Sequence, residues 1–258
     1  MKAKTWGISL GESAGLGLAL VLSTFTWGVA RAESTEPAFA VLVFSKTAGY
    51  RHDSIPSGIA AIRALGEQND FGVDASEDAA VFNDESLARY KVVVFLSTSG
   101  DVLNPGEQAA FEKFIQRGGG FVGIHSATDT EYDWPWYGDL VGNYFRRHPV
   151  IQSARLKVID PSHRSTRQLP IEWPRTDEWY DFQHDLDPDI TVLIRIDEKT
   201  YKGGRMGADH PISWYQTYDG GRAWYTAIGH TPESYKEPLF LEHLLGGVTW
   251  AAGVLPAR

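Results

Sequence analysis

The chain has 258 residues, no cysteine and a formal net charge of −9 at pH 7. This charge argues against nucleic acid and anionic membranes as partners, because both attract basic surfaces. The lack of cysteine excludes disulfides, thiolate catalysis and cysteine-ligated zinc, so the fold must depend on its hydrophobic core.

Residues 1–32 have the pattern of a secretory signal peptide, with two lysines, a mostly apolar run over 14–30 and a small-x-small cleavage site at 30–32. The apolar run is shorter than the roughly 20 residues that span a bilayer; the alternative is an uncleaved membrane anchor. We expect cleavage, a periplasmic or secreted protein free of the membrane, and one domain over 38–254. The sequence leaves the oligomeric state open.

The first half of the chain predicts alternating strands and helices. Continuous apolar runs are typical of strands buried on both faces, and they occur at 38–44, 91–96 and 121–124, with a shorter candidate at 71–75. One helix is predicted over 54–69. A second begins after Asn104, which is followed by Pro105 and Glu107, and ends at the glycines 118–120. This alternation predicts right-handed βαβ units and an open parallel sheet.

The second half is less regular. We expect an aromatic loop at 133–140 and a closing helix at 238–252, which Gly246 and Gly247 weaken. The remaining predicted elements are strands, at 152–159, at 190–196, and in a hairpin of 211–218 with 222–228 around Asp219-Gly220-Gly221.

His125 is the first candidate for chemistry. It directly follows a predicted buried strand, and Gly123 and Ala127 lie two residues to either side. Small residues at these places allow a sharp strand-to-helix turn that exposes the central side chain, as in a nucleophile elbow. Ligands of open α/β sheets bind at this edge, where strands end. The alternative is a histidine that is hydrogen-bonded within a loop.

His210 and His230 are the next candidates. If residues 219–221 form a three-residue loop, Tyr218 pairs with Arg222 and the two histidines lie directly opposite each other. Cross-strand neighbours are roughly 5 Å apart, which suits a shared metal or a common substrate hydroxyl. A two-residue turn would shift this register by one, and a solvated pair at the strand end is the alternative.

Four further places carry candidate residues. The acidic and aromatic segment 177–181 contains Glu178 and Tyr180; its carboxylates either complete a metal shell or catalyse proton transfer, or they lie in a solvated loop. His52 follows the first strand and is a ligand or proton carrier, or a bystander beside a helix cap. His148 faces either the site or the solvent. The fourth place is an aromatic patch of Trp134, Trp136 and Tyr137, whose rings either stack on sugar rings or fill the core.

Together, these residues resemble the ThuA-like family, which is named from trehalose utilisation. The resemblance covers essentially the whole chain after the predicted signal peptide. It is carried by GYRHDS (49–54), GGGFVGIHSAT (118–128), RRHP (146–149), DEWYDF (177–182), DHPISW (209–214), RAWYTAIGH (222–230) and GVTWAAG (247–253).

The resemblance implies an α/β fold, namely a flavodoxin-like three-layer sandwich related to class I glutamine amidotransferases. The expected central sheet is mostly parallel, with the antiparallel hairpin added to it. Amidotransferases of this fold place a catalytic cysteine at the elbow, in a G-x-C-x-G pattern. The matching stretch here is Gly123-Ile124-His125-Ser126-Ala127, and the chain has no cysteine, so glutamine hydrolysis by a thiolate is excluded.

The resemblance also implies a role in carbohydrate catabolism, with a glycoside or keto-sugar as the small-molecule partner. We expect an isomerase, lyase or hydrolase with one divalent metal, zinc or manganese-like, and no nucleotide cofactor. His125, His210 and His230 would hold the metal and act with Glu178 in catalysis. The expected substrate contacts are His52, Trp134, Trp136, Tyr137, His148 and Tyr180. The alternative is a carbohydrate-binding domain without catalysis.

Overall fold

The computed structural model describes residues 1–7 and 37–254. Residues 1–7 contain no helix or strand, and the rest of the predicted signal peptide, with its cleavage site, lies outside the described residues. Within the described ranges, no helix is both long and apolar enough to cross a bilayer. All the elements below therefore belong to the unit that begins near residue 36.

A nine-stranded sheet forms the centre of this unit, with the strand order β2-β1-β3-β4-β11-β10-β9-β6-β7. Its first five strands are parallel and follow the flavodoxin-like order, which confirms the predicted fold. These strands are β1 (Phe39–Phe44), β2 (Phe71–Ser76), β3 (Val92–Leu96), β4 (Gly120–Ile124) and β11 (Gly221–Thr226). The continuous apolar runs of β1, β3 and β4 are buried, as expected for strands that are covered on both faces.

The other four strands extend the sheet in antiparallel order. They are β6 (Gln152–Val158), β7 (Glu172–Asp177), β9 (Thr191–Ile196) and β10 (Pro211–Tyr218). A separate small antiparallel sheet pairs β5 (Phe145–Arg147) with β8 (Asp181–Phe182). The sequence did not indicate β7. Its exposed positions are polar or charged and Pro174 interrupts it, a pattern tolerated at the edge of a sheet.

The predicted register of the hairpin is wrong by one residue. Tyr218 pairs with Gly221, so that the turn contains two residues, Asp219 and Gly220. Their φ angles of 46° and 92° are both left-handed, as a two-residue type I′ turn requires, and Asp-Gly is a preferred sequence for it. This shift also removes the argument that placed His210 opposite His230.

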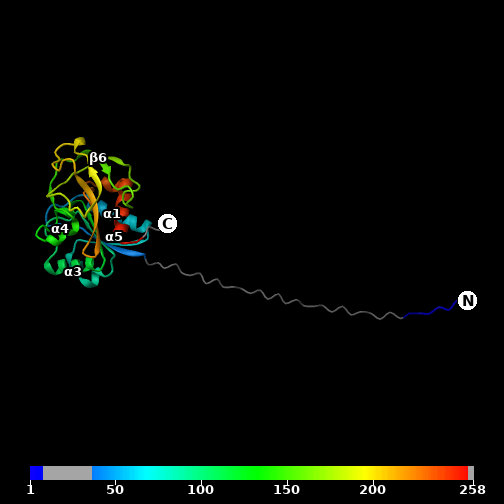
Figure 1. Cartoon of the computed structure of the whole chain (residues 1–258). Coiled ribbons are helices and arrows are strands. Elements are labelled where there is room, and N and C mark those ends of the chain that lie inside the picture. Colours follow the sequence, from blue (N-terminus) through cyan, green and yellow to red (C-terminus); the bar gives the residue numbers. More distant parts are fainter. Residues whose placement is uncertain (8–36, 255–258) are drawn as a thin grey trace. The chain divides into compact units, whose positions relative to one another are not determined.

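Helices cover both faces of the sheet. Figure 1 shows α1 (Ile55–Gln68) beside α5 (Pro238–Ala251), with α3 (Pro105–Gln116) and α4 (Pro135–Val141) together on the other side of the sheet. The short α2 (Asp84–Leu87) contacts α3. This arrangement confirms the three-layer sandwich. The predicted aromatic loop is partly wrong, because Pro135 begins a helix there and Gly142, with φ of 93°, ends it.

Short 3-10 helices complete the fold and shape the edge at which the parallel strands end. They are η1 (Ala79–Val81), η2 (His125–Asp129), η3 (Glu198–Thr200) and η4 (Ser234–Lys236). The predicted cap of α3 is confirmed, because Asn104 and Glu107 form a reciprocal capping box. The glycine pair in α5 also has a role in packing. A Cβ atom on Gly246 would lie 2.3 Å from the Cα atom of Ser165, so glycine allows this close approach.

Candidate functional site

Four side chains meet beyond the ends of β1, β4, β7 and β11. They are His52, His125, Glu178 and His230, and one nitrogen or oxygen atom from each lies within 4.8 Å of the others. All but His230 are buried, and His230 is partly exposed. The structure therefore brings together two of the three predicted metal ligands, His125 and His230. It adds His52 and Glu178 to them and places His210 elsewhere.

His125 lies at the sharp turn that the sequence predicted. Its φ angle of 53° is left-handed, a conformation that non-glycine residues rarely adopt. The turn is tight, since a Cβ atom on Gly123 would lie 3.2 Å from that of Ala127. The ring Nδ1 atom lies 2.8 Å from the carbonyl oxygen of Ala227 and therefore donates to it. In the neutral ring, the Nε2 lone pair then faces the cluster.

The spacing of the cluster fits a divalent metal. The His125 Nε2 atom lies 3.1 Å from His52 Nε2 and 3.1 Å from His230 Nδ1. Glu178 Oε2 lies 3.2 Å from the same His230 atom. Ligands on a tetrahedral zinc ion, with bonds of about 2 Å, would be roughly 3.3 Å apart. The three imidazoles and one carboxylate are also the ligand types that zinc and similar ions take.

Burial and the mutual contacts of these groups shift their pKa values in different directions. Burial, followed by repulsion from His125 and His230, lowers the pKa of His52 to about 2, so its imidazole is neutral. Burial alone would raise the pKa of Glu178, but hydrogen bonds with His125 and His230 lower it to about 2. Burial would lower the pKa of His230, and its bond with Glu178 raises it instead. The shifts therefore favour a neutral His52 and an attraction between Glu178 and a protonated His230.

Tyr180 and His148 border the cluster. The Tyr180 hydroxyl lies 3.0 Å from His125 Nε2, and burial raises the pKa of Tyr180 well above 10, so that the phenol keeps its proton. His148 Nδ1 lies 2.9 Å from Glu178 Oε1. Its side chain is 42% exposed and connects the buried carboxylate with solvent. The structure thus places both residues beside the cluster, and their role as substrate contacts stays a prediction.

Asp177 is a supporting residue that sequence reasoning did not single out. Its fully buried carboxylate accepts hydrogen bonds from the backbone amides of Glu178, Gly229 and His230. It also accepts hydrogen bonds from Ser234 and Arg175. These contacts tie the end of β7 to the segment after β11. The sequence offered one signal, because Asp177 begins the DEWYDF segment.

His210 lies in a second group with Asp181 and Glu198. Its Nε2 atom lies 2.7 Å from the backbone oxygen of Tyr180, and its Nδ1 atom lies 2.8 Å from Glu198. Both ring nitrogens of His210 therefore already have partners. The Asp181 carboxylate forms an ion pair with Arg147, at 2.6 Å between Oδ2 and Nη1. His210 holds the backbone of Tyr180, whose hydroxyl contacts His125, so the predicted ligand contacts the cluster only through another residue.

The aromatic patch does not form an open platform. Trp134 and Tyr137 are buried, and the Tyr137 hydroxyl donates to the backbone of Ala127. Trp136 stacks on Trp134 and donates to Asp219 at the hairpin turn. The expected stacking of sugars on these rings is therefore not supported, because the rings pack against one another and the core. The alternative function, a carbohydrate-binding domain without catalysis, therefore lacks the aromatic platform that was proposed for it.

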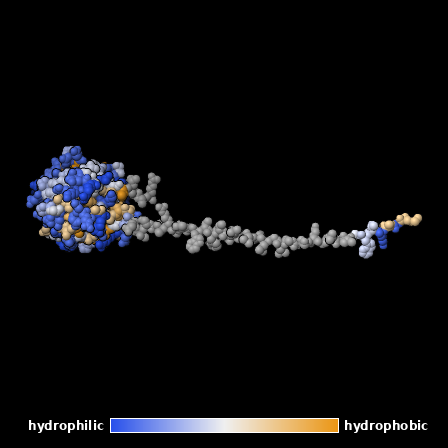
Figure 2. Space-filling view, turned by 90° about the horizontal axis from the view of Figure 1, so that it is seen from below, coloured by the Kyte–Doolittle hydropathy of each residue, from blue (hydrophilic) through white to orange (hydrophobic). Residues whose placement is uncertain are grey.

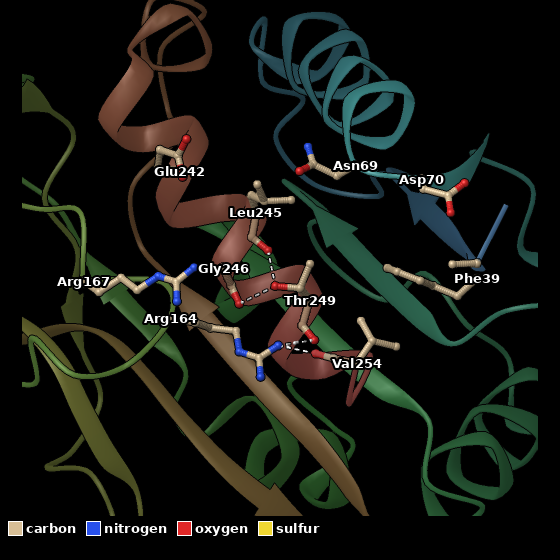
Figure 3. A pocket seen from close by; sticks show the side chains of 11 residues that line it. Phe39, Asn69, Asp70, Arg164, Arg167, Glu242, Leu245, Gly246, Thr249 and Val254 are labelled. Carbon is tan, nitrogen blue, oxygen red and sulfur yellow. Dashed lines mark hydrogen bonds between the residues drawn. The ribbon is translucent and has the colours of Figure 1, made fainter. Parts of the chain in front are cut away.

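A cavity of about 200 Å³ lies apart from the cluster (Figure 3). Phe39, Asn69 and Asp70 line one side of it. Residues of α5, with Arg164 and Arg167, line the other side. Arg164 spans part of its wall and donates to the backbone of Thr249 and Val254. None of the cluster residues lines this cavity, so it is not the candidate site.

Comparisons with known proteins agree with the fold. Residues 40–251 match the ThuA family, described as trehalose utilisation. A putative ThuA-like protein from Bacteroides uniformis ATCC 8492 has 23% identity and a TM-score of 0.73, over 87% of this chain and 95% of that one. A second, from Parabacteroides merdae ATCC 43184, has 20% identity and a TM-score of 0.71, over 86% and 92%.

A β-galactosidase from Bacillus circulans sp. alkalophilus shares the fold in part. It has 16% identity and a TM-score of 0.56, and the match covers 85% of this chain but 32% of that one. No curated protein matches the sequence. At these identities, the solved structures show the fold alone.

Proposed function

Because the chain belongs to the ThuA family, described as trehalose utilisation, we propose that it is an exported, metal-dependent enzyme that acts on a glycoside or keto-sugar. The family supports the carbohydrate-related role. The observation that carries the rest is the meeting of His52, His125, Glu178 and His230 at the strand ends. Such a set of imidazoles and a carboxylate is typical of catalytic metal sites in enzymes.

His52, His125, His230 and Glu178 would hold the metal. A divalent metal bound there would polarise a substrate carbonyl or activate water. His125 offers its Nε2 atom because its Nδ1 proton is committed to Ala227. Such a backbone bond fixes the ring orientation and the tautomer, as is common for metal-binding histidines.

The neighbouring side chains would handle protons. Tyr180 keeps its phenolic proton because burial raises its pKa, so it can donate to a developing negative charge on the substrate. His148 lies between Glu178 and solvent, and imidazole is well suited to carry protons near neutral pH. This arrangement suits proton transfer at a carbon next to a ketone, as in isomerisation or elimination, and it is also compatible with hydrolysis.

The experiment is a turnover screen of glycosides and their 3-keto derivatives with metal-loaded protein. For the keto-sugars, nuclear magnetic resonance in deuterated water follows exchange of the proton next to the ketone. We expect activity in the unaltered protein, a loss of about 100-fold or more in His125→Ala, and full activity in His184→Ala. His184 is a matched control because it is exposed and its ring contacts the backbone oxygen of Asp185, away from the cluster. Full activity in His125→Ala would contradict the proposal.

Export rests on the predicted signal peptide. Amino-terminal sequencing of protein from the periplasm or the medium should begin at Glu33, directly after the small-x-small triplet. Protein that remains in the cytoplasm with its first 32 residues intact would contradict this part of the proposal.

A further inference from the structure

One aromatic ring beside the cluster is open to solvent. Tyr50 is 62% exposed, whereas the ring of Tyr180, which contacts His125, is buried. The rings of Tyr50 and His52 form a T-shaped pair, with centroids 4.8 Å apart and planes at 82°. Because His52 is one of the four cluster residues, Tyr50 lies at the border of the site and not on a distant surface.

The backbone that carries Tyr50 is held in place. Ser99 Oγ donates to the carbonyl oxygen of Tyr50 at 2.6 Å. The amides of Ala48 and Gly49 donate to the carbonyl oxygen of Ser99 at 2.7 and 3.1 Å. The loop after β1 is thus fastened to the loop after β3. The ring is therefore presented without a large entropy cost for ordering its backbone on binding.

Other exposed groups lie in the chain segment that contacts Glu178. His148, which contacts Glu178, is followed two residues later by Val150, which is 79% exposed. In Figure 2 the face in view is mostly hydrophilic, with apolar residues in smaller patches. Exposed apolar side chains beside a cluster of polar groups are a common mark of a ligand site.

We propose that the ring of Tyr50 is the platform on which a pyranose ring of the substrate stacks. This inference rests on the proposed function, and Tyr50 takes the place of Trp134 and Trp136, which stack on each other, as the sugar-stacking surface. The C–H face of a pyranose is apolar and matches an aromatic face, while its hydroxyl groups need polar partners. Those partners are available beside Tyr50 in the cluster and in the half-exposed His148.

The test measures sugar binding by isothermal titration calorimetry on zinc-loaded, full-length mature protein. The probes are trehalose and its 3-keto derivative. We expect the dissociation constant to rise about tenfold in Tyr50→Ala and to stay within about twofold in Tyr50→Phe, since stacking needs the ring and not the hydroxyl. Ile171→Ala is the matched control, because Ile171 is 59% exposed and precedes β7, whose other end carries Glu178.

Zinc content separates this inference from the proposed function. Tyr50 is not a ligand, so Tyr50→Ala should keep the zinc content of the unaltered protein. Unchanged sugar affinity in Tyr50→Ala would overturn the platform alone. Zinc lost together with sugar affinity would also overturn it, because the effect would then run through His52. If the unaltered protein binds zinc but neither sugar, the proposed substrate class fails together with the platform.

Discussion

At the scale of single residues, His125 combines an unusual backbone conformation with a central place in the site. Its left-handed φ of 53° costs about 1 kcal/mol for most side chains, whereas glycine adopts it freely. The small residues Gly123 and Ala127 allow the tight turn in which this conformation occurs, since a Cβ atom on Gly123 would lie 3.2 Å from that of Ala127. Backbone strain of this kind is concentrated at functional sites.

This strain gives a test that is independent of catalysis. His125→Ala and His125→Gly lose the same bond to Ala227, but only alanine keeps a Cβ atom in the left-handed region. We therefore expect His125→Gly to be about 1 kcal/mol more stable than His125→Ala, measured by urea unfolding. A glycine variant that is less stable than the alanine variant would contradict the assigned backbone conformation.

The candidate site could be predicted from the sequence only in part. His125 follows a strand whose apolar run is clear, and the same logic pointed to His52 as a ligand or proton carrier. His230 was proposed from the hairpin register, and Glu178 from its acidic and aromatic segment. His210 was misplaced, because a single residue of hairpin register decides which side chains are opposite each other. The contact of Glu178 with His230 depends on how β7 is tied to the segment after β11, and no local pattern encodes that.

At the scale of elements, clear periodicity and capping signals allowed the prediction of the parallel strands and of α1, α3 and α5. The elements that were missed or misjudged depend on tertiary contacts. In β7, polar residues and Pro174 conceal an edge strand. In α4, a short helix forms where aromatic residues pack on the sheet, with Tyr137 fully buried. Such packing overrides weak local preference.

Asp177 joins two of these elements, and its charge should support the site. In Asp177→Asn, the amides of Glu178 and His230 would face a weaker acceptor, and the buried Arg175 would lose its closest carboxylate. We expect a loss of about 3 kcal/mol in the free energy of unfolding, and zinc affinity lower by about tenfold or more.

Urea unfolding and zinc titration of the folded variant would measure the two effects separately. Glu237→Gln is the control, because Glu237 also contacts Arg175 but is 38% exposed and contributes no bond to the cluster. Equal zinc affinity in Asp177→Asn and Glu237→Gln would show that Asp177 stabilises the fold without positioning the ligands.

At the scale of the whole molecule, stability should fall in weak acid. His243 is fully buried in α5, and burial lowers its pKa to about 3, whereas an unfolded chain takes up this proton near pH 6.5. Below pH 6.5 the unfolded state therefore binds more protons than the folded state, and stability decreases as the pH falls. His243 alone accounts for about 2 kcal/mol between pH 6.5 and pH 5.

Urea unfolding at several pH values would measure this slope. His243→Gln keeps a polar side chain but cannot be charged, so its stability should depend less on pH over this interval. An unchanged slope in the variant would mean that other groups, such as the buried His163 with its pKa lowered to about 4 by burial, dominate the acid sensitivity.

The central claim is that His52, His125, Glu178 and His230 form one metal site. Its most direct test is the zinc and manganese content, by elemental mass spectrometry, of purified protein and of two variants. We expect about one ion per chain in the unaltered protein and in His210→Asn, and a loss of the ion in His52→Ala. Circular dichroism would check that both variants fold. No bound ion in the unaltered protein after incubation with either metal, or an ion lost with His210 and kept without His52, would contradict the account.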